Sequence, residues 1–178
     1  MTRLEESGDR ENAIWTISHR ADLHRDQGHS DEARTLYGKA LNEFRELGFS
    51  SGTACCLHDL AALDVSELNL TRAEARYGEC LRLYGTENKE DLPRVLESMA
   101  VAAHQAGRPA RALTLAGAGA RFRERFHVLS KDARQRSRVQ ETIEAARSEA
   151  GPEASAHWMR GWNMSPTELL EWATHQED

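Results

Sequence analysis

The segment DQGHSDEARTLYGKALNEF at residues 26–44 recurs twice along the chain in altered form. It aligns without gaps to SELNLTRAEARYGECLRLY at 66–84 and to QAGRPARALTLAGAGARFR at 105–123. The alignment brings Ala33, Ala73 and Ala112 to one position, in steps of 40 and 39 residues. Self-similarity at a fixed period of this length predicts an array of repeated structural units.

A stretch of periodically spaced apolar residues precedes each of these segments, at residues 13–27, 53–68 and 91–106. Apolar residues three and four apart on one face are typical of an amphipathic helix. Each unit is therefore predicted to consist of a helix, a short turn and a second helix. Gly28 and Gly107 suit the left-handed turn that ends a first helix, and Pro109 suits the first turn of the next one.

Small residues occupy a second matched position, where the three segments carry Ala40, Cys80 and Gly119. Small side chains let two helix backbones approach closely, so Gly117 and Gly119 are interpreted as helix-packing positions. The alternative is a dinucleotide-binding glycine loop. That loop needs a third Gly or Ala where Phe122 stands and a preceding strand, neither of which the sequence offers.

The C-terminal part predicts a cap on this array. Residues 165–168, SPTE, form a helix-starting capping box with Pro at the first helical position. We expect one domain, 1–178, with repeat units at about 12–48, 52–85 and 90–127 and capping helices at about 131–176. The predicted fold class is all-α, a right-handed helical-repeat solenoid of three helix-turn-helix units plus the C-terminal capping helices.

At this level of detail the chain resembles the tetratricopeptide repeat, with its small first-helix residue, its turn Gly and its Ala–aromatic–Ala second helix. The longer period resembles arrays at the C-terminal end of bacterial signal-transduction ATPases and of LuxR-, MalT- or AfsR-like transcriptional regulators. ARTLYGKALNEFRELG at 33–48 matches the cadence of those arrays, and HWMRGWNMSPTELLEWAT at 157–174 resembles their last unit. The resemblance implies a sensor or scaffold part of a bacterial regulator.

Composition narrows the class of protein. The chain has 178 residues, 39% of them hydrophobic, and a net charge of −6, which is typical of a globular domain without a strongly basic surface for nucleic acid. No run approaches 18 apolar residues, so no membrane-spanning helix is expected. Three cysteines without framework spacing predict reduced thiols and a cytoplasmic location.

Other chemistry has weak support in the sequence. The basic stretch from Arg121 to Arg138 is interpreted as a solvated helix face paired with Glu124, Asp132 and Glu141, and direct nucleic-acid binding through it is the less favoured alternative. Cys80 is expected in the core, and the histidines lack ligand spacing, so no metal site and no cofactor are predicted. No activating pair of residues can be named, and the chain is not expected to be an enzyme.

The remaining candidate site is the concave groove that stacked first helices form in such solenoids. The repeat register predicts as its lining Trp15, Ser18, Asp22 and Arg25 from unit one; Cys55, His58, Ala62 and Val65 from unit two; and Arg94, Glu97, Val101 and His104 from unit three. We expect this groove to bind a protein, a peptide or a small ligand. The partner expected from the resemblance is an attached ATPase or DNA-binding module, and a self-associating homodimer remains the alternative.

Overall fold

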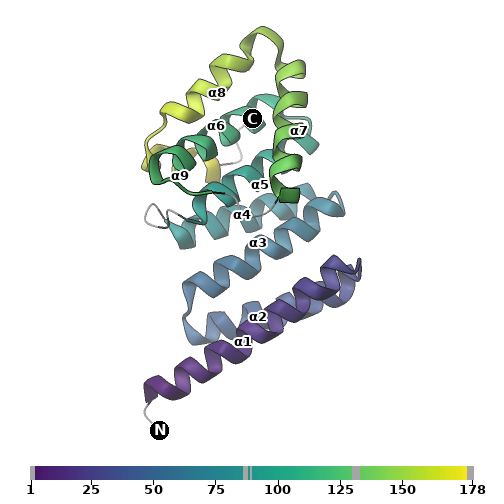
Figure 1. Cartoon of the computed structure of the whole chain (residues 1–178), viewed down its shortest axis with the longest axis vertical. Coiled ribbons are helices and arrows are strands. Elements are labelled where there is room, and N and C mark those ends of the chain that lie inside the picture. Colours follow the sequence, from purple (N-terminus) through teal and green to yellow (C-terminus); the bar gives the residue numbers. More distant parts are fainter. Residues whose placement is uncertain (1–2, 86–87, 89, 130–132, 176–178) are drawn as a thin grey trace.

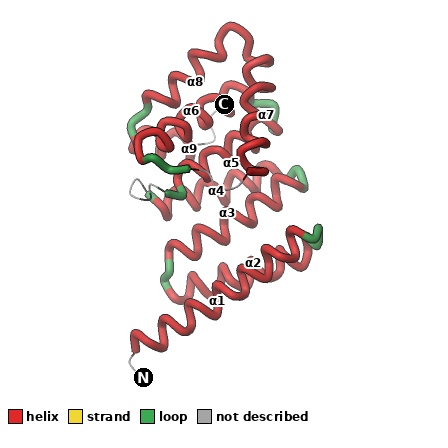
Figure 2. The backbone as a smooth tube through the Cα atoms, in the orientation of Figure 1, coloured by secondary structure: helices red, strands yellow, loops and turns green. Residues whose placement is uncertain are grey.

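The computed structural model describes residues 3–85, 88, 90–129 and 133–175, and the side chains from residue 8 onward. Over these residues every regular element is a helix, and no strand occurs (Figure 2). The helices are α1 (Arg3–Asp26), α2 (Ser30–Leu47), α3 (Ser50–Ser66), α4 (Leu70–Tyr84), α5 (Leu92–Gln105), α6 (Pro109–Phe126), α7 (Ala133–Ala150), the 3-10 turn Gly151–Glu153, α8 (Ala154–Asn163) and α9 (Pro166–Thr174). The predicted all-α repeat solenoid is confirmed.

The first six helices pack as three consecutive pairs. Figure 1 shows them stacked along the long axis, with α1 and α2 at one end and α8 at the other. Helices α1 and α2, α3 and α4, and α5 and α6 contact each other, while α2 against α3 and α4 against α5 join the units. Each pair is thus one predicted unit, and its hydrophobic faces are covered by its neighbours.

The matched alanines lie in the core. Ala33 of α2 and Ala73 of α4 are fully buried, as are Ala21 of α1 and Ala61 of α3, which are also 40 residues apart. A methyl group at each position lets the backbones approach, and the aromatic ring four residues later fills the space between the layers. Burial of these residues confirms the register deduced from the repeat.

The turns inside the units confirm the left-handed positions predicted from glycine. Gly28 has a φ of 82° and Gly107 a φ of 73°. In unit two the same position is held by Leu68, with a φ of 60°. A branched side chain is disfavoured in this conformation. The turn of unit two is therefore conformationally strained, which reduces its stability relative to a turn with glycine.

The C-terminal helices cap the array differently from a fourth unit. Helix α7 packs beside α5 and α6, in the place that the first helix of a fourth unit would occupy. Helix α8, however, packs mainly on α6 and does not form a pair with α7. The α6–α8 contact is made by glycines: a Cβ on Gly117 would lie 3.1 Å from the carbonyl carbon of Trp158, and one on Gly161 would lie 2.7 Å from that of Thr114. Gly119 faces α5, so both glycines of the repeat are helix-packing positions as predicted.

Helix α9 returns to α4 and buries Leu169 and Ala173. The Ser165 side chain accepts from the backbone N–H of Glu168, and the Glu168 carboxylate accepts from that of Ser165, so the predicted capping box is confirmed. The ends of the predicted capping segment, at residues 131 and 176, lie outside the described residues.

The N-terminal helix extends beyond its predicted start near residue 13, because α1 begins at Arg3. Nothing between residues 3 and 12 stops a helix except Gly8, which a helix tolerates. Arg10 forms an ion pair of 3.2 Å with Glu46 on α2. The described helices include none long and apolar enough to cross a membrane.

Candidate functional site

The predicted groove residues lie along the row of first helices, α1, α3 and α5, and differ in exposure. Five are buried: Ser18, His58, Val65, Glu97 and Val101. The others are half-buried: Trp15, Asp22, Arg25, Cys55, Ala62, Arg94 and His104. The second group is therefore accessible to solvent in part, whereas neighbouring residues cover the first.

A polar cluster joins α1 to α3 beneath this face. The Tyr37 hydroxyl, from α2, donates to Asp22 Oδ1 at 2.6 Å and accepts from Arg25 Nη1 at 2.9 Å. Arg25 also lies 3.1 Å from Asp22 and 3.8 Å from the buried carboxylate of Asp59 on α3. These contacts fix two half-exposed charges, Asp22 and Arg25, in one orientation.

A second cluster joins α3 to α5. Arg94 Nη1 lies 3.0 Å from His58 Nδ1, and His58 Nε2 lies 3.0 Å from Ser98 Oγ. Because a guanidinium can only donate, Nδ1 accepts and the ring proton sits on Nε2, which donates to Ser98. Burial and the Arg94 charge lower the pKa of His58, so the ring is neutral. Burial opposes ionisation of Asp59, but its polar contact with the His58 ring and the charges of Arg94 and Arg25 keep its pKa below the usual value.

Trp15 lies in an aromatic cluster at the edge of the row. Its ring centroid is 4.9 Å from that of Phe44 and 6.3 Å from that of Phe49. His19 stacks on it at 6.2 Å. The indole is therefore held by α2 and the following turn and presents one part of its surface to solvent.

Sequence reasoning missed a buried carboxylate at the turn end of α3. Asp64 is fully buried and accepts from Arg34 and Arg72, each at 2.8 Å, and from Arg76. Arg34 also forms an ion pair with Glu67, with a nitrogen–oxygen distance of 2.8 Å. The available signal was an acidic residue inside the apolar run LAALDV at 60–65, because a buried charge requires partners. This cluster links units one and two and leaves Asp64 inaccessible to a ligand.

The basic stretch predicted at Arg121–Arg138 is divided between α6 and α7, and its residues Lys131 and Asp132 lie outside the described ones. Arg121 pairs with Glu124 at 3.0 Å, as expected for a solvated face. The expectation that the arginines after Gly119 face water is wrong for Arg123, which donates to both carboxylate oxygens of the buried Glu97. Two of the basic side chains are thus neutralised by carboxylates.

The cysteines are free thiols, with Cys56 and Cys80 fully buried. Cys80 donates to the carbonyl oxygen of Ala54 at 3.3 Å, which confirms its predicted place in the core. Burial raises the pKa of each of these two thiols to about 12, so neither is a ready nucleophile. In the described part of the chain, no three His, Cys, Asp or Glu side chains are grouped to hold a metal ion.

Comparison with known proteins agrees with this architecture. A family model described as tetratricopeptide repeat matches residues 12–86, which span most of α1 and all of α2, α3 and α4. No curated protein and no solved structure matches the chain. Residues 12–86 are similar to tetratricopeptide repeats, and α5 with α6 continues the same packing; the chain is a tetratricopeptide-like helical array.

Proposed function

We propose that this chain is a non-catalytic interaction module that binds a peptide or protein on the face of α1, α3 and α5. Stacked helical repeats present extended surfaces of this kind to their partners. Here the face offers an aromatic ring, Trp15, a small residue, Ala62, and charges of both signs. Such a mixture suits a polar peptide or a protein surface.

Preorganisation of the charged groups supports the proposal most directly. The side chains of Arg25 and Arg94 are 35% and 33% exposed, yet each is fixed by hydrogen bonds to the cluster beneath. A partner that pairs with them loses less side-chain entropy than it would with free arginines. The interior clusters thus serve binding by holding the surface charges in place.

The wider setting we propose is a bacterial signalling or transcriptional regulator, with an attached ATPase or DNA-binding module as partner. The sequence patterns of residues 33–48 and 157–174, which resemble those of such regulators, support it. The sequence that flanks this chain in the native polypeptide tests this setting, because a regulator should encode such a module beside the array. A native polypeptide without one would contradict it.

The binding face is tested by blocking it without disturbing its interior. Ala62 is half-buried on α3 in the middle of the row, and Ala75 is exposed on α4, away from it. Replacing Ala62 by Trp should abolish capture of a partner from a lysate of the source organism, whereas Ala75→Trp should preserve it. Equal capture by both variants would contradict the proposal.

Self-association is the competing function, either through this face or through the tryptophans of α8. Trp158 and Trp162, which could have served a dimer, are half-buried and covered in part by Arg147 at 5.1 Å and Arg121 at 5.5 Å from their rings. Light scattering should therefore report a monomer. A dimer that Ala62→Trp dissociates would assign the face to a second copy of the chain.

A further inference from the structure

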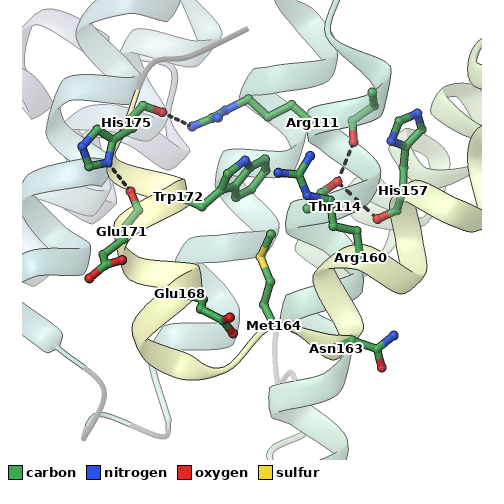
Figure 3. A pocket seen from close by; sticks show the side chains of 11 residues that line it. Arg111, Thr114, His157, Arg160, Asn163, Met164, Glu168, Glu171, Trp172 and His175 are labelled. Atoms are coloured by element: carbon green, nitrogen blue, oxygen red, sulfur yellow. Dashed lines mark hydrogen bonds between the residues drawn. The ribbon is translucent and has the colours of Figure 1, made fainter.

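An open pocket of about 1000 Å³ lies between α6, α8 and α9, away from the row of first helices. Arg111 and Thr114 of α6, Arg160 of α8 and Trp172 of α9 line it (Figure 3). The pocket is built by α6 of the third unit together with α8 and α9, which follow the repeats, so nothing in the repeat pattern indicates it.

Arg111 is a buried cation that forms no ion pair with a carboxylate of the described residues. Its residue is 9% exposed, and Nη2 donates to the backbone carbonyl oxygens of Ala173 at 2.9 Å and His175 at 3.1 Å. Nη1 is buried and has no hydrogen-bond partner among the described residues. An interior guanidinium stays charged, so within the described part of the chain its positive charge is balanced by carbonyl dipoles.

Other partly buried arginines show how unusual this is. Arg25, Arg34, Arg94 and Arg123 each lie within 4.0 Å of at least one carboxylate. Burial and the neighbouring Arg108 charge lower the pKa of Arg111, and no carboxylate among residues 3–175 that the structure describes raises it. The pocket beside Arg111 is therefore a place where an added negative charge is stabilised.

A second guanidinium and an aromatic face complete the arrangement. Trp172 lies between the two arginines, with Arg111 Cζ 4.7 Å and Arg160 Cζ 5.4 Å from its ring (Figure 3). Arg160 is exposed and free to adjust to a ligand. The carboxylate of Glu168 at the rim accepts from the Ser165 backbone N–H at 2.8 Å and is engaged in the helix cap.

We propose that this pocket binds a small organic carboxylate, whose anionic group pairs with Arg160 over the buried charge of Arg111 and whose apolar body packs on Trp172 and on Met164, which also lines the pocket. A monoanion fits better than a phosphate dianion, because the carboxylates of Glu168 and Glu171 also line the rim. This site lies on helices other than those of the proposed peptide-binding face, so failure of one proposal would leave the other unaffected.

The test is titration of the full chain with benzoate, followed by the indole N–H signal of Trp172 in NMR at constant ionic strength. The signal is assigned with Trp172→Phe. Benzoate should produce a saturable shift, whereas benzyl alcohol, which lacks the charge, and inorganic phosphate should not. Saturable binding of either control compound, or no benzoate shift up to about 10 mM, would overturn the proposal.

Variants locate the charge that matters. Arg160→Gln should weaken benzoate binding about tenfold or more, as expected for loss of a charged hydrogen bond. Arg121→Gln is the matched control, because Arg121 lies 5.5 Å over Trp162 outside this pocket; it should bind as the native chain does. Arg111→Gln should also lose binding, and if that variant fails to fold, the Arg160 and Arg121 pair decides. Unchanged affinity in Arg160→Gln would refute the site.

The acidic residues that follow His175 in sequence, Glu177 and Asp178, supply one more comparison. The double variant E177Q/D178N should bind benzoate with native affinity. Binding that appears only in this variant would mean that the chain's own carboxylates occupy the site, which would overturn the proposal for an external ligand.

Discussion

Replacing Gly161 by Ala should undo the close crossing of α8 on α6. The new Cβ would lie 2.7 Å from the carbonyl carbon of Thr114 and 3.0 Å from the backbone nitrogen of Ala118. Carbon atoms in contact need about 3.5 to 4 Å, so the helices must separate by roughly 1 Å. Backbone atoms cannot rotate away as a side-chain end can, and a gap of that size forfeits a quarter to a half of the contact energy along the crossing.

The expected free-energy change follows from two opposing effects. Overpacking of this kind costs about 3 kcal/mol, and Ala in place of Gly inside a helix returns about 1 kcal/mol. The net loss of about 2 kcal/mol should lower the melting temperature by about 6 °C for a chain of this size. Circular dichroism at 222 nm during heating measures it.

Gly38→Ala is the matched control, because Gly38 lies inside α2 and a Cβ there would meet nothing within 4 Å. It should raise the melting temperature by about 3 °C through helix propensity alone. If Gly161→Ala were as stable as the native chain, or as stable as Gly38→Ala, the backbone contact between α6 and α8 would be refuted.

Three further changes test other parts of the structure. Asp64→Asn keeps the shape of a fully buried side chain but leaves three arginines without the carboxylate that they share. Urea denaturation should show that the free energy of unfolding falls by about 3 kcal/mol, and a fall below about 1 kcal/mol would contradict the cluster. Leu68→Gly should stabilise the fold by about 1 kcal/mol, because Leu68 has a φ of 60° and is 69% exposed; a destabilised variant would show that its conformation carries no cost. The pKa of His58 is lowered in the folded chain, so the unfolded chain binds the extra proton and stability should fall as the pH drops below about 6.5, by up to about 1.4 kcal/mol per pH unit. Denaturation at several pH values should show a shallower fall for His58→Gln, and an identical slope would refute a neutral buried ring.

The repeat was readable from the sequence because its determinants are local. Ala33 and Ala73 mark a close crossing within a unit, Gly28 marks a left-handed turn, and Ser165 with Glu168 marks a helix start. Each depends on residues near it in the chain, so spacing alone predicts it. The helix pairs and the packing role of Gly119 follow from the same pattern.

The parts that escaped prediction depend on contacts between distant segments. Arg123 was expected to face water, but Glu97, on a different helix, buries and neutralises it. The charge of Arg111 becomes significant only when α9 returns to place two carbonyl groups beside it. Gly161 meets α6 because α8 leaves the repeat pattern, and no periodicity records that departure.

The face of α1, α3 and α5 is the central claim, and one affinity comparison tests it most directly. The dissociation constant of a captured partner should be measured by calorimetry for the native chain, Ala62→Trp and Ala75→Trp. The indole ring of Ala62→Trp would lie in the middle of the proposed face. The affinity of this variant for the partner should therefore fall by about a hundredfold, which corresponds to about 2.7 kcal/mol. Ala75→Trp should bind as the native chain does. Equal dissociation constants for the two variants would contradict the assignment of this face to partner binding.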